Sequence, residues 1–146
     1  GCFADQSRVY SYRRQKIGPG KDNYSSWKSS FIGPKGSYQF LKPVVVLTSR
    51  ATSSSAEMFV MAMQVLPNVT IVGDTTGGGV GNPIFRELPN GWSYRLSTEI
   101  EADAQGRIIE GVGVFPDVPV LTTAADSANG IDRILEKGID IIRKSQ

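Results

Sequence analysis

The stretch LTSRATSSSAEMFVMAMQVL, residues 47–66, decides the fold of this chain. It begins at the end of an apolar strand, passes through a turn rich in hydroxyl groups, and continues as an almost wholly apolar helix. A β-branched run precedes it (PVVV, 43–46) and a second apolar run follows it (VTIVGD, 69–74). Such runs are typical of strands buried on both faces of a parallel or mixed sheet. The order predicts a βαβ unit with a right-handed crossover.

The helix is predicted from about Ser55 to Leu66, and only Glu57 and Gln64 are polar after its first residue. A helix that is apolar all round is buried, either within its own domain or in an interface. This pattern therefore predicts a helix enclosed by other parts of the protein.

Further elements are expected on both sides of this unit. Residues 8–14 (RVYSYRR) alternate as a strand does, whereas residues 16–27 and 31–38 are rich in Gly, Pro, Ser and Asn and predict loops. Residues 84–101 predict a hairpin that turns at Pro-Asn-Gly. A final helix is expected to begin near residues 126–127, with Ile and Leu recurring along one face.

The composition is that of one globular domain. The chain has 146 residues, 40% of them apolar and 21% charged. It contains one cysteine, Cys2, and no histidine, so we expect no internal disulfide, no metal site and no cofactor. Residues 1–50 carry nine basic and two acidic side chains, which gives this part a net charge of +7. The remaining residues carry seven basic and twelve acidic side chains, which gives a net charge of −5. The basic residues are scattered and lack a recognition motif, so nucleic acid is not an expected partner.

The three serines where the helix begins have two interpretations. Ser53 or Ser54 could cap the helix with Glu57 as the capping-box partner, and this is the simpler explanation of the pattern. A serine at such a strand-to-helix turn could also be a nucleophile. The unpaired N–H groups and the dipole of the helix N-terminus would then stabilise an oxyanion formed beside it.

Two later segments are also candidates for a functional site. Gly77, Gly78 and Gly79 follow a predicted strand, but the Walker lysine and the G-x-G-x-x-G spacing are missing. The three glycines therefore predict a loop that borders a site rather than a nucleotide cradle. Glu110, in IIEGVGVFPD, is an acid in an apolar extended stretch. It could orient a base or simply be an exposed strand residue.

Taken together, four segments resemble the peptidase domain of the tail-specific (C-terminal processing) protease and tricorn-core superfamily. They are VVVLTSRATSSSAEMFVMAM, VGDTTGG, LPNGWSY and IIEGVGVFPDVPV. The combination of S-x-x-E, G-[DE]-x-T-x-G and E-G-x-G-[VI]-x-P-D carries the resemblance, over roughly residues 38–145. It implies an α/β fold with a crotonase-like (ClpP/crotonase) core. It also implies one domain over residues 1–146 that is the C-terminal half of a serine peptidase domain, with 1–37 as a variable lead-in and 38–146 as the core.

The resemblance also implies roles for individual residues. The nucleophile of the family falls on Ser54, and Ser55, the second choice for that role, would offer its N–H to the oxyanion. Glu110 matches the glutamate that assists the base in the tricorn-like branch. The lysine base of the tail-specific branch falls on Gly79, so that base is missing here. The histidine base of the tricorn-like branch would then come from an N-terminal part of the parent protein.

The resemblance implies a peptide or unfolded protein as substrate, an extracytoplasmic location in the periplasm or cell envelope, and a potential homo-oligomer. The chain alone is expected to be inactive because it contains neither base. Three other functions remain open. They are a non-catalytic peptide- or lipid-binding module of the same fold, a crotonase-type enzyme acting on an acyl thioester, and an assembly role for the apolar helix.

Overall fold

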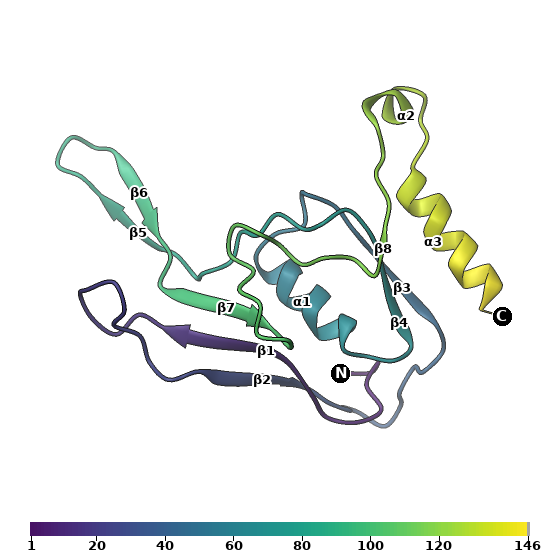
Figure 1. The fold of residues 1–146 in the computed structure, drawn as a ribbon, viewed down its shortest axis with the longest axis horizontal. Helices are drawn as coiled ribbons and strands as arrows, with labels where there is room; N and C mark the ends of the chain where they lie inside the picture. Colours follow the sequence, from purple (N-terminus) through teal and green to yellow (C-terminus); the bar gives the residue numbers. More distant parts are fainter. Residues whose placement is uncertain (146) are drawn as a thin grey trace.

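A computed structural model describes residues 1–145 of the chain, and its centre is the predicted βαβ unit (Figure 1). Strand β3 (Val44–Thr48), helix α1 (Ser55–Gln64) and strand β4 (Val69–Gly73) follow one another, and β3 pairs with β4 in parallel. Strand β8 (Val118–Pro119) extends this sheet on the other side of β4, so β4 is its central strand. The order strand, helix, parallel strand is confirmed.

A second, antiparallel sheet has the strand order β2-β1-β7. It contains β1 (Arg8–Gln15), β2 (Lys28–Ile32) and β7 (Glu99–Asp103). The strand predicted over residues 8–14 is confirmed, but the loop predicted from residue 31 is wrong at its start, because β2 extends through Ile32. Local composition misses β2, whose KSSFI sequence contains two serines, because its stability comes from pairing with β1.

Helix α1 lies between the two sheets (Figure 1), and one of its faces supplies much of the core. Val60, Met61 and Met63 are each at most 2% exposed and pack in one cluster with Ile71 of β4. Phe59 is 52% exposed, so the described residues do not enclose the helix on all sides, and burial of this part in an interface stays a prediction. The sheets cover only part of the helix surface.

The predicted hairpin is confirmed as β5 (Ile84–Glu87) paired antiparallel with β6 (Ser93–Leu96). Its turn includes Gly91, which has a φ of 83° and donates its N–H to the carbonyl of Leu88. The hairpin projects away from both sheets (Figure 1), and all residues of its two strands are exposed.

The C-terminal region forms two helices instead of one, so the predicted start of the final helix is wrong. Residues 124–128 form the short helix α2 (Ala124–Ala128), and the chain turns at Gly130, which has a φ of 70°. Helix α3 (Arg133–Lys144) then begins with Asp132 as its cap. Capping therefore places the boundary later than apolar periodicity suggested.

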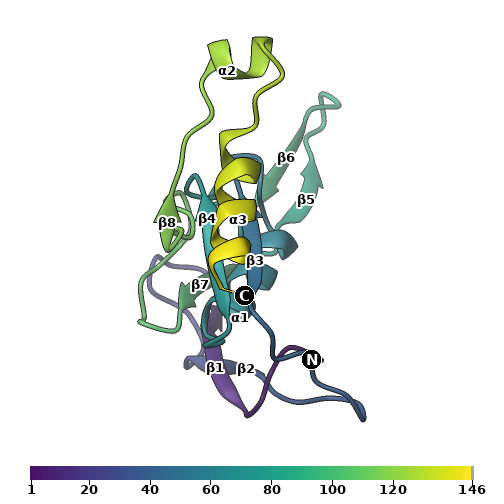
Figure 2. The same cartoon turned by 90° about the vertical axis from the view of Figure 1, so that its right-hand side faces the viewer.

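Helix α3 packs against strand β3 (Figure 2). Gly138 makes the close approach possible, because a Cβ there would lie 2.9 Å from Leu47 Cδ2 and 3.3 Å from Val45 Cγ1. Leu47 is still 41% exposed, so the expectation that β3 is buried on both faces is wrong. No helix among the described residues is long and apolar enough to cross a membrane.

Candidate active site

Ser54 stands at the turn between strand β3 and helix α1, as the N-cap residue of the helix. Its φ of 58° and ψ of −124° are unusual for a residue with a side chain. Such a conformation costs about 1–3 kcal/mol and persists only where the surrounding structure enforces it. It leaves Ser54 exposed at the helix N-terminus.

Local hydrogen bonds fix the turn that leads to Ser54. The N–H of Ser49 donates to the hydroxyl of Thr52 at 3.1 Å, and the N–H of Thr52 donates to the carbonyl of Ser49 at 2.9 Å. The N–H of Gly77 donates to the carbonyl of Thr52 at 2.8 Å, which ties the turn to the glycine loop. The hydroxyl-rich sequence thus folds into a compact turn because its side chains replace missing backbone partners.

The carboxylate of Glu57, fully buried in the first turn of α1, organises the whole region. It accepts hydrogen bonds from the N–H of Ser54 at 2.9 Å, of Gly78 at 2.7 Å and of Gly79 at 2.9 Å. It also accepts one from the hydroxyl of Thr76. The predicted capping box of Ser54 and Glu57 is therefore present, although no directed hydrogen bond to the Ser54 hydroxyl accompanies it. The box holds the Ser54 backbone and leaves its hydroxyl available.

Thr76 extends this network to the segment that carries Glu110. Its hydroxyl oxygen accepts a hydrogen bond from the N–H of Val114 at 2.7 Å, and its own N–H donates to the Val114 carbonyl at 3.1 Å. Asp117, in the same segment, accepts from the N–H of Ile71 at 2.7 Å, which anchors the segment to β4. Hydrogen bonds thus connect the S-x-x-E and T-x-G motifs to Val114, and Asp117 of the P-D motif separately ties the same segment to β4.

The glycine loop packs directly against the serine turn, where the sequence had placed a bordering loop. A Cβ at Gly77 would lie 2.9 Å from the carbonyl oxygen of Arg50. One at Gly78, which has a φ of 71°, would lie 2.7 Å from the N–H nitrogen of Val112. One at Gly79 would lie 2.5 Å from Ser53 Oγ, a side chain that can rotate. Backbone crowding therefore demands glycine at Gly77 and Gly78 but not at Gly79.

Glu110 is exposed and accepts a hydrogen bond from the hydroxyl of Ser97 at 3.2 Å. Both side chains adjoin Gly81, because a Cβ at Gly81 would lie 2.7 Å from Ser97 Oγ and 3.2 Å from Glu110 Oε2. Gly81 lines the same pocket as Ser54, so the Ser97–Glu110 pair stands beside that pocket. Ser97 was not singled out in the sequence, where it is one hydroxyl in a hairpin flank.

The pocket at Ser54 has a volume of about 340 Å³ and is lined by residues from four parts of the chain. The serine turn and α1 contribute Ser54, Ser55 and Met58; the glycine loop contributes Val80, Gly81 and Asn82; β1 and β7 contribute Arg13, Glu99 and Glu101. Ser55 is the first residue of α1, so its N–H has no partner within the helix.

Glu101 is the titratable group of this pocket with the most perturbed environment. It is 4% exposed, and burial raises the pKa of its carboxyl to about 7, although Ser11 and Arg13 act in the opposite direction. Its position in the site cannot be inferred from the sequence alone. The alternation in TEIE places Glu99 and Glu101 on one face of β7, but only the fold shows that this face adjoins Ser54.

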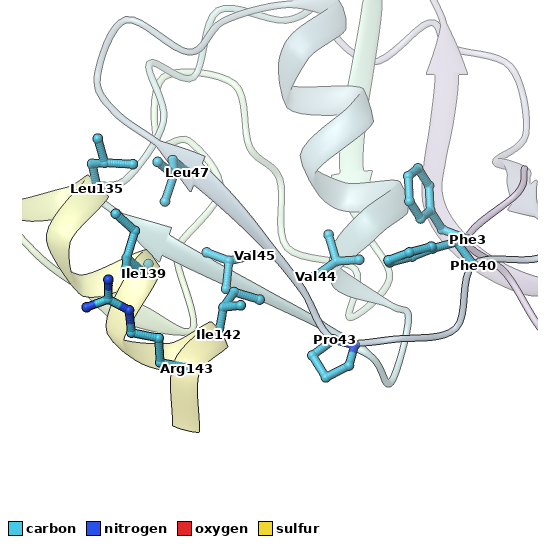
Figure 3. A pocket seen from close by; sticks show the side chains of 11 residues that line it. Phe3, Phe40, Pro43, Val44, Val45, Leu47, Leu135, Ile139, Ile142 and Arg143 are labelled. Carbon is cyan, nitrogen blue, oxygen red and sulfur yellow. The ribbon is translucent and has the colours of Figure 1, made fainter. Parts of the chain in front are cut away.

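A larger cavity, about 590 Å³, lies elsewhere, between α3 and β3 (Figure 3). Leu135, Ile139 and Ile142 of α3 face Val45 and Leu47 of β3, and Arg143 is the only charged residue in the lining. It contains no nucleophile or acid, so it is a loosely packed apolar seam and not a site of chemistry. No group of three or more His, Cys, Asp or Glu side chains within residues 1–145 could hold a metal ion.

Comparison with known proteins identifies the family. Residues 1–120 match the sequence profile of Peptidase family S41. A candidate tricorn protease homolog 2 of Streptomyces coelicolor is 34% identical over 100 residues, which are 66% of this chain and 8% of that protein. The carboxy-terminal processing protease CtpA of Bacillus subtilis is 32% identical over 77 residues, which are 53% of this chain and 16% of that protein. The chain thus spans less than a quarter of the length of these relatives.

Solved structures agree with this result. The crystal structure of a candidate peptidase from Parabacteroides merdae superposes with a TM-score of 0.85 at 36% identity, over 96% of this chain and 44% of that chain. Mature CPAF in complex with lactacystin has a TM-score of 0.74 at 16% identity, over 98% of this chain and 38% of that chain, and shows a shared fold. The recognised family is confirmed. The match begins at residue 1, earlier than the resemblance over residues 38–145 had implied.

Proposed function

The chain belongs to peptidase family S41, and we propose that it forms part of a serine peptidase domain in which Ser54 is the nucleophile. The observation that carries this proposal is the backbone of Ser54, a non-glycine residue with a φ of 58° at the N-terminus of α1. A strained, exposed serine at a strand-to-helix turn is what a nucleophile requires, and a helix cap does not need this strain.

The proposed reaction is acyl transfer. A base removes the proton from Ser54 Oγ as that oxygen attacks a peptide carbonyl, and the N–H of Ser55 donates to the oxyanion that forms. The intermediate expels the amine, which takes the proton from the base, and water then hydrolyses the acyl-serine. Glu110 is the proposed acid, and its hydrogen bond with Ser97 supports a role in orienting the base through that serine.

The base itself lies outside this chain under the proposal. The sequence contains no histidine, and no lysine lies between Lys42 and Lys137. Losing a triad member costs about 10⁴-fold or more in kcat, so the chain alone should be inactive. We therefore infer that it is the C-terminal part of a longer, crotonase-like peptidase domain. The 44% coverage of the Parabacteroides merdae chain supports this inference.

Within that longer domain, we propose residues 1–37 as the lead-in and 38–146 as the core, although β1 and β2 already form sheet structure within the lead-in. The substrate would be a peptide or unfolded protein, and the location extracytoplasmic. Both follow from the resemblance to carboxy-terminal processing proteases, such as the one named for Bacillus subtilis. Self-association is compatible with the exposed Phe59 on α1.

One observation favours a second function, a non-catalytic peptide-binding module of the same fold. The position that matches the lysine base of the tail-specific branch is Gly79, and the histidine alternative is missing as well. Such a module would keep the pocket at Ser54 without using the hydroxyl.

A fluorophosphonate probe distinguishes the two functions in the longer protein that the proposal requires. We expect labelling of wild type and of Ser55→Ala, and none of Ser54→Ala. Equal labelling of all three proteins, or none of any, would favour the binding module. Loss of labelling with Ser55→Ala alone would move the nucleophile to Ser55.

A further inference from the structure

The pocket at Ser54 contains a buried carboxyl group that the proposed peptidase chemistry does not use. Glu101 projects from β7 and is 4% exposed. Its Oε1 accepts a hydrogen bond from Ser11 at 3.3 Å, whereas its Oε2 is buried and has no hydrogen-bond partner among the described residues. A buried acceptor without a donor costs about 1–3 kcal/mol. The oxygen is therefore a candidate contact for a ligand that brings a donor.

The charges around Glu101 indicate which donor fits. Glu99, two residues earlier on β7, lines the same pocket, and Arg13 lies opposite Glu101 in the β1–β7 register. These are the charged residues in the pocket lining, since the serine turn, α1 and the glycine loop contribute only uncharged residues. With both carboxyls ionised the lining has a net charge of −1. A cationic ligand is thus favoured over an anionic one.

The rest of the lining suits a long side chain with a charged end. Met58 and Val80 supply apolar surface in the same lining. Lysine and arginine pack their methylene stems against apolar surface and place their charge at the far end. The pocket volume of about 340 Å³ accommodates one such side chain.

We propose that this pocket is a specificity subsite that receives a lysine or arginine side chain of the peptide substrate. The cationic group donates to Glu101 Oε2 and is also attracted by Glu99, while the neighbouring backbone lies at Ser54. This inference rests on the proposed function for its location beside the scissile bond. The residues proposed to bind the cation all lie within the 146-residue chain.

Peptide binding to the chain tests the subsite without any need for turnover. Two blocked pentapeptides of alanine carry either lysine or norleucine at the centre, so they differ in the ammonium group at closely similar shape. We expect the lysine peptide to bind at least about tenfold more tightly at pH 8, by calorimetric or NMR titration. Glu101→Gln should abolish this preference, and Arg13→Gln should increase it because it removes the competing cation.

Glu136→Gln, on the exposed side of α3, is the matched control and should leave the preference unchanged. Should Glu101→Gln fail to fold, Glu99→Gln, on a half-buried residue, should still reduce the preference. Equal affinity for the two peptides, absence of binding by both, or a preference that survives Glu101→Gln would overturn the subsite. Tighter binding of a glutamate-centred peptide would also overturn it and would assign the pocket to Arg13.

Labelling of Ser54 separates this result from the proposed function. If fluorophosphonate labels Ser54 in the longer protein but lysine is not preferred, only the subsite is wrong. If lysine is preferred and Ser54 is never labelled, the cation binding at Glu101 stands and the peptidase chemistry is wrong.

Discussion

The buried carboxylate of Glu57 accepts a hydrogen bond from the hydroxyl of Thr76, which lies 19 residues further along the chain. This contact joins the first turn of α1 to the glycine loop, and through Thr76 to Val114. The position of Ser54 therefore depends on a network that spans three separate segments.

Glu57→Gln should destabilise the chain by about 2–4 kcal/mol. The amide can accept at one end only, and its NH₂ group would face backbone N–H groups that now donate to the carboxylate. Urea unfolding measures the effect, with Glu136→Gln as a surface control expected within about 0.5 kcal/mol of wild type. A Glu57→Gln protein as stable as this control would contradict the role assigned to the network.

Ser54→Gly should be more stable than Ser54→Ala by about 1 kcal/mol. Glycine adopts a positive φ without steric cost, whereas alanine retains the strain of the native turn. Both variants lack the hydroxyl, so the difference between their free energies of unfolding measures the backbone strain alone. Equal unfolding midpoints in urea would show that the turn is not strained.

Gly78→Ala and Gly79→Ala should differ sharply although the residues are adjacent. At Gly78 the new Cβ would meet backbone atoms of residues 111–113, and the φ is positive. We therefore expect the free energy of unfolding to fall by about 3 kcal/mol or more. At Gly79 it would meet only Ser53 Oγ, which can rotate, and a loss of under about 1 kcal/mol is expected. Thermal unfolding of both variants decides, and similar losses would argue against the loop geometry described.

Gly79→Lys should create a base beside Ser54 in the isolated chain. The position matches the lysine of the tail-specific branch, and a lysine there would place an amine beside the serine turn. Labelling of Ser54 by a fluorophosphonate should become at least about tenfold faster than in wild type, and the rate should increase with pH as the new amine loses its proton. Gly79→Met is the uncharged control, and equal rates in the two variants would rule out the predicted geometry.

Stability should decrease as the pH rises from about 5 to 8, because of Glu101. Burial raises the pKa of this carboxyl in the folded chain to about 7, so the folded state holds its proton where the unfolded state has lost it. The stabilisation from this proton is complete below the pKa that Glu101 has in the unfolded state. It is lost as the pH rises through the pKa that Glu101 has in the folded state. Between pH 5 and 8 the free energy of unfolding is expected to fall by about 1–2 kcal/mol, after allowance for screening by Arg13 and solvent.

Glu101→Gln should remove this dependence and should be more stable than wild type at pH 8, since the amide stays neutral. Unfolding midpoints at pH 5, 6, 7 and 8 give the comparison. A wild-type profile parallel to that of Glu101→Gln would exclude Glu101 as the group responsible.

The sequence by itself determined the βαβ unit, the hairpin turn and the family. Strand and helix periodicity from Val44 to Gly73 is local, and the peptidase motifs lie within short segments, so both can be read without a fold. The serine turn was also identified as a candidate, and the capping role of Glu57 was anticipated. These features depend on residues close together in the chain.

The tertiary structure alone decided the rest. Strand β2 exists because it pairs with β1. The contacts of Glu57 with Thr76, of Ser97 with Glu110, and of Glu101 with the Ser54 pocket all join segments that are distant in sequence. Sequence periodicity gives the face on which a side chain lies, but only the packing of sheets and loops brings two such faces together.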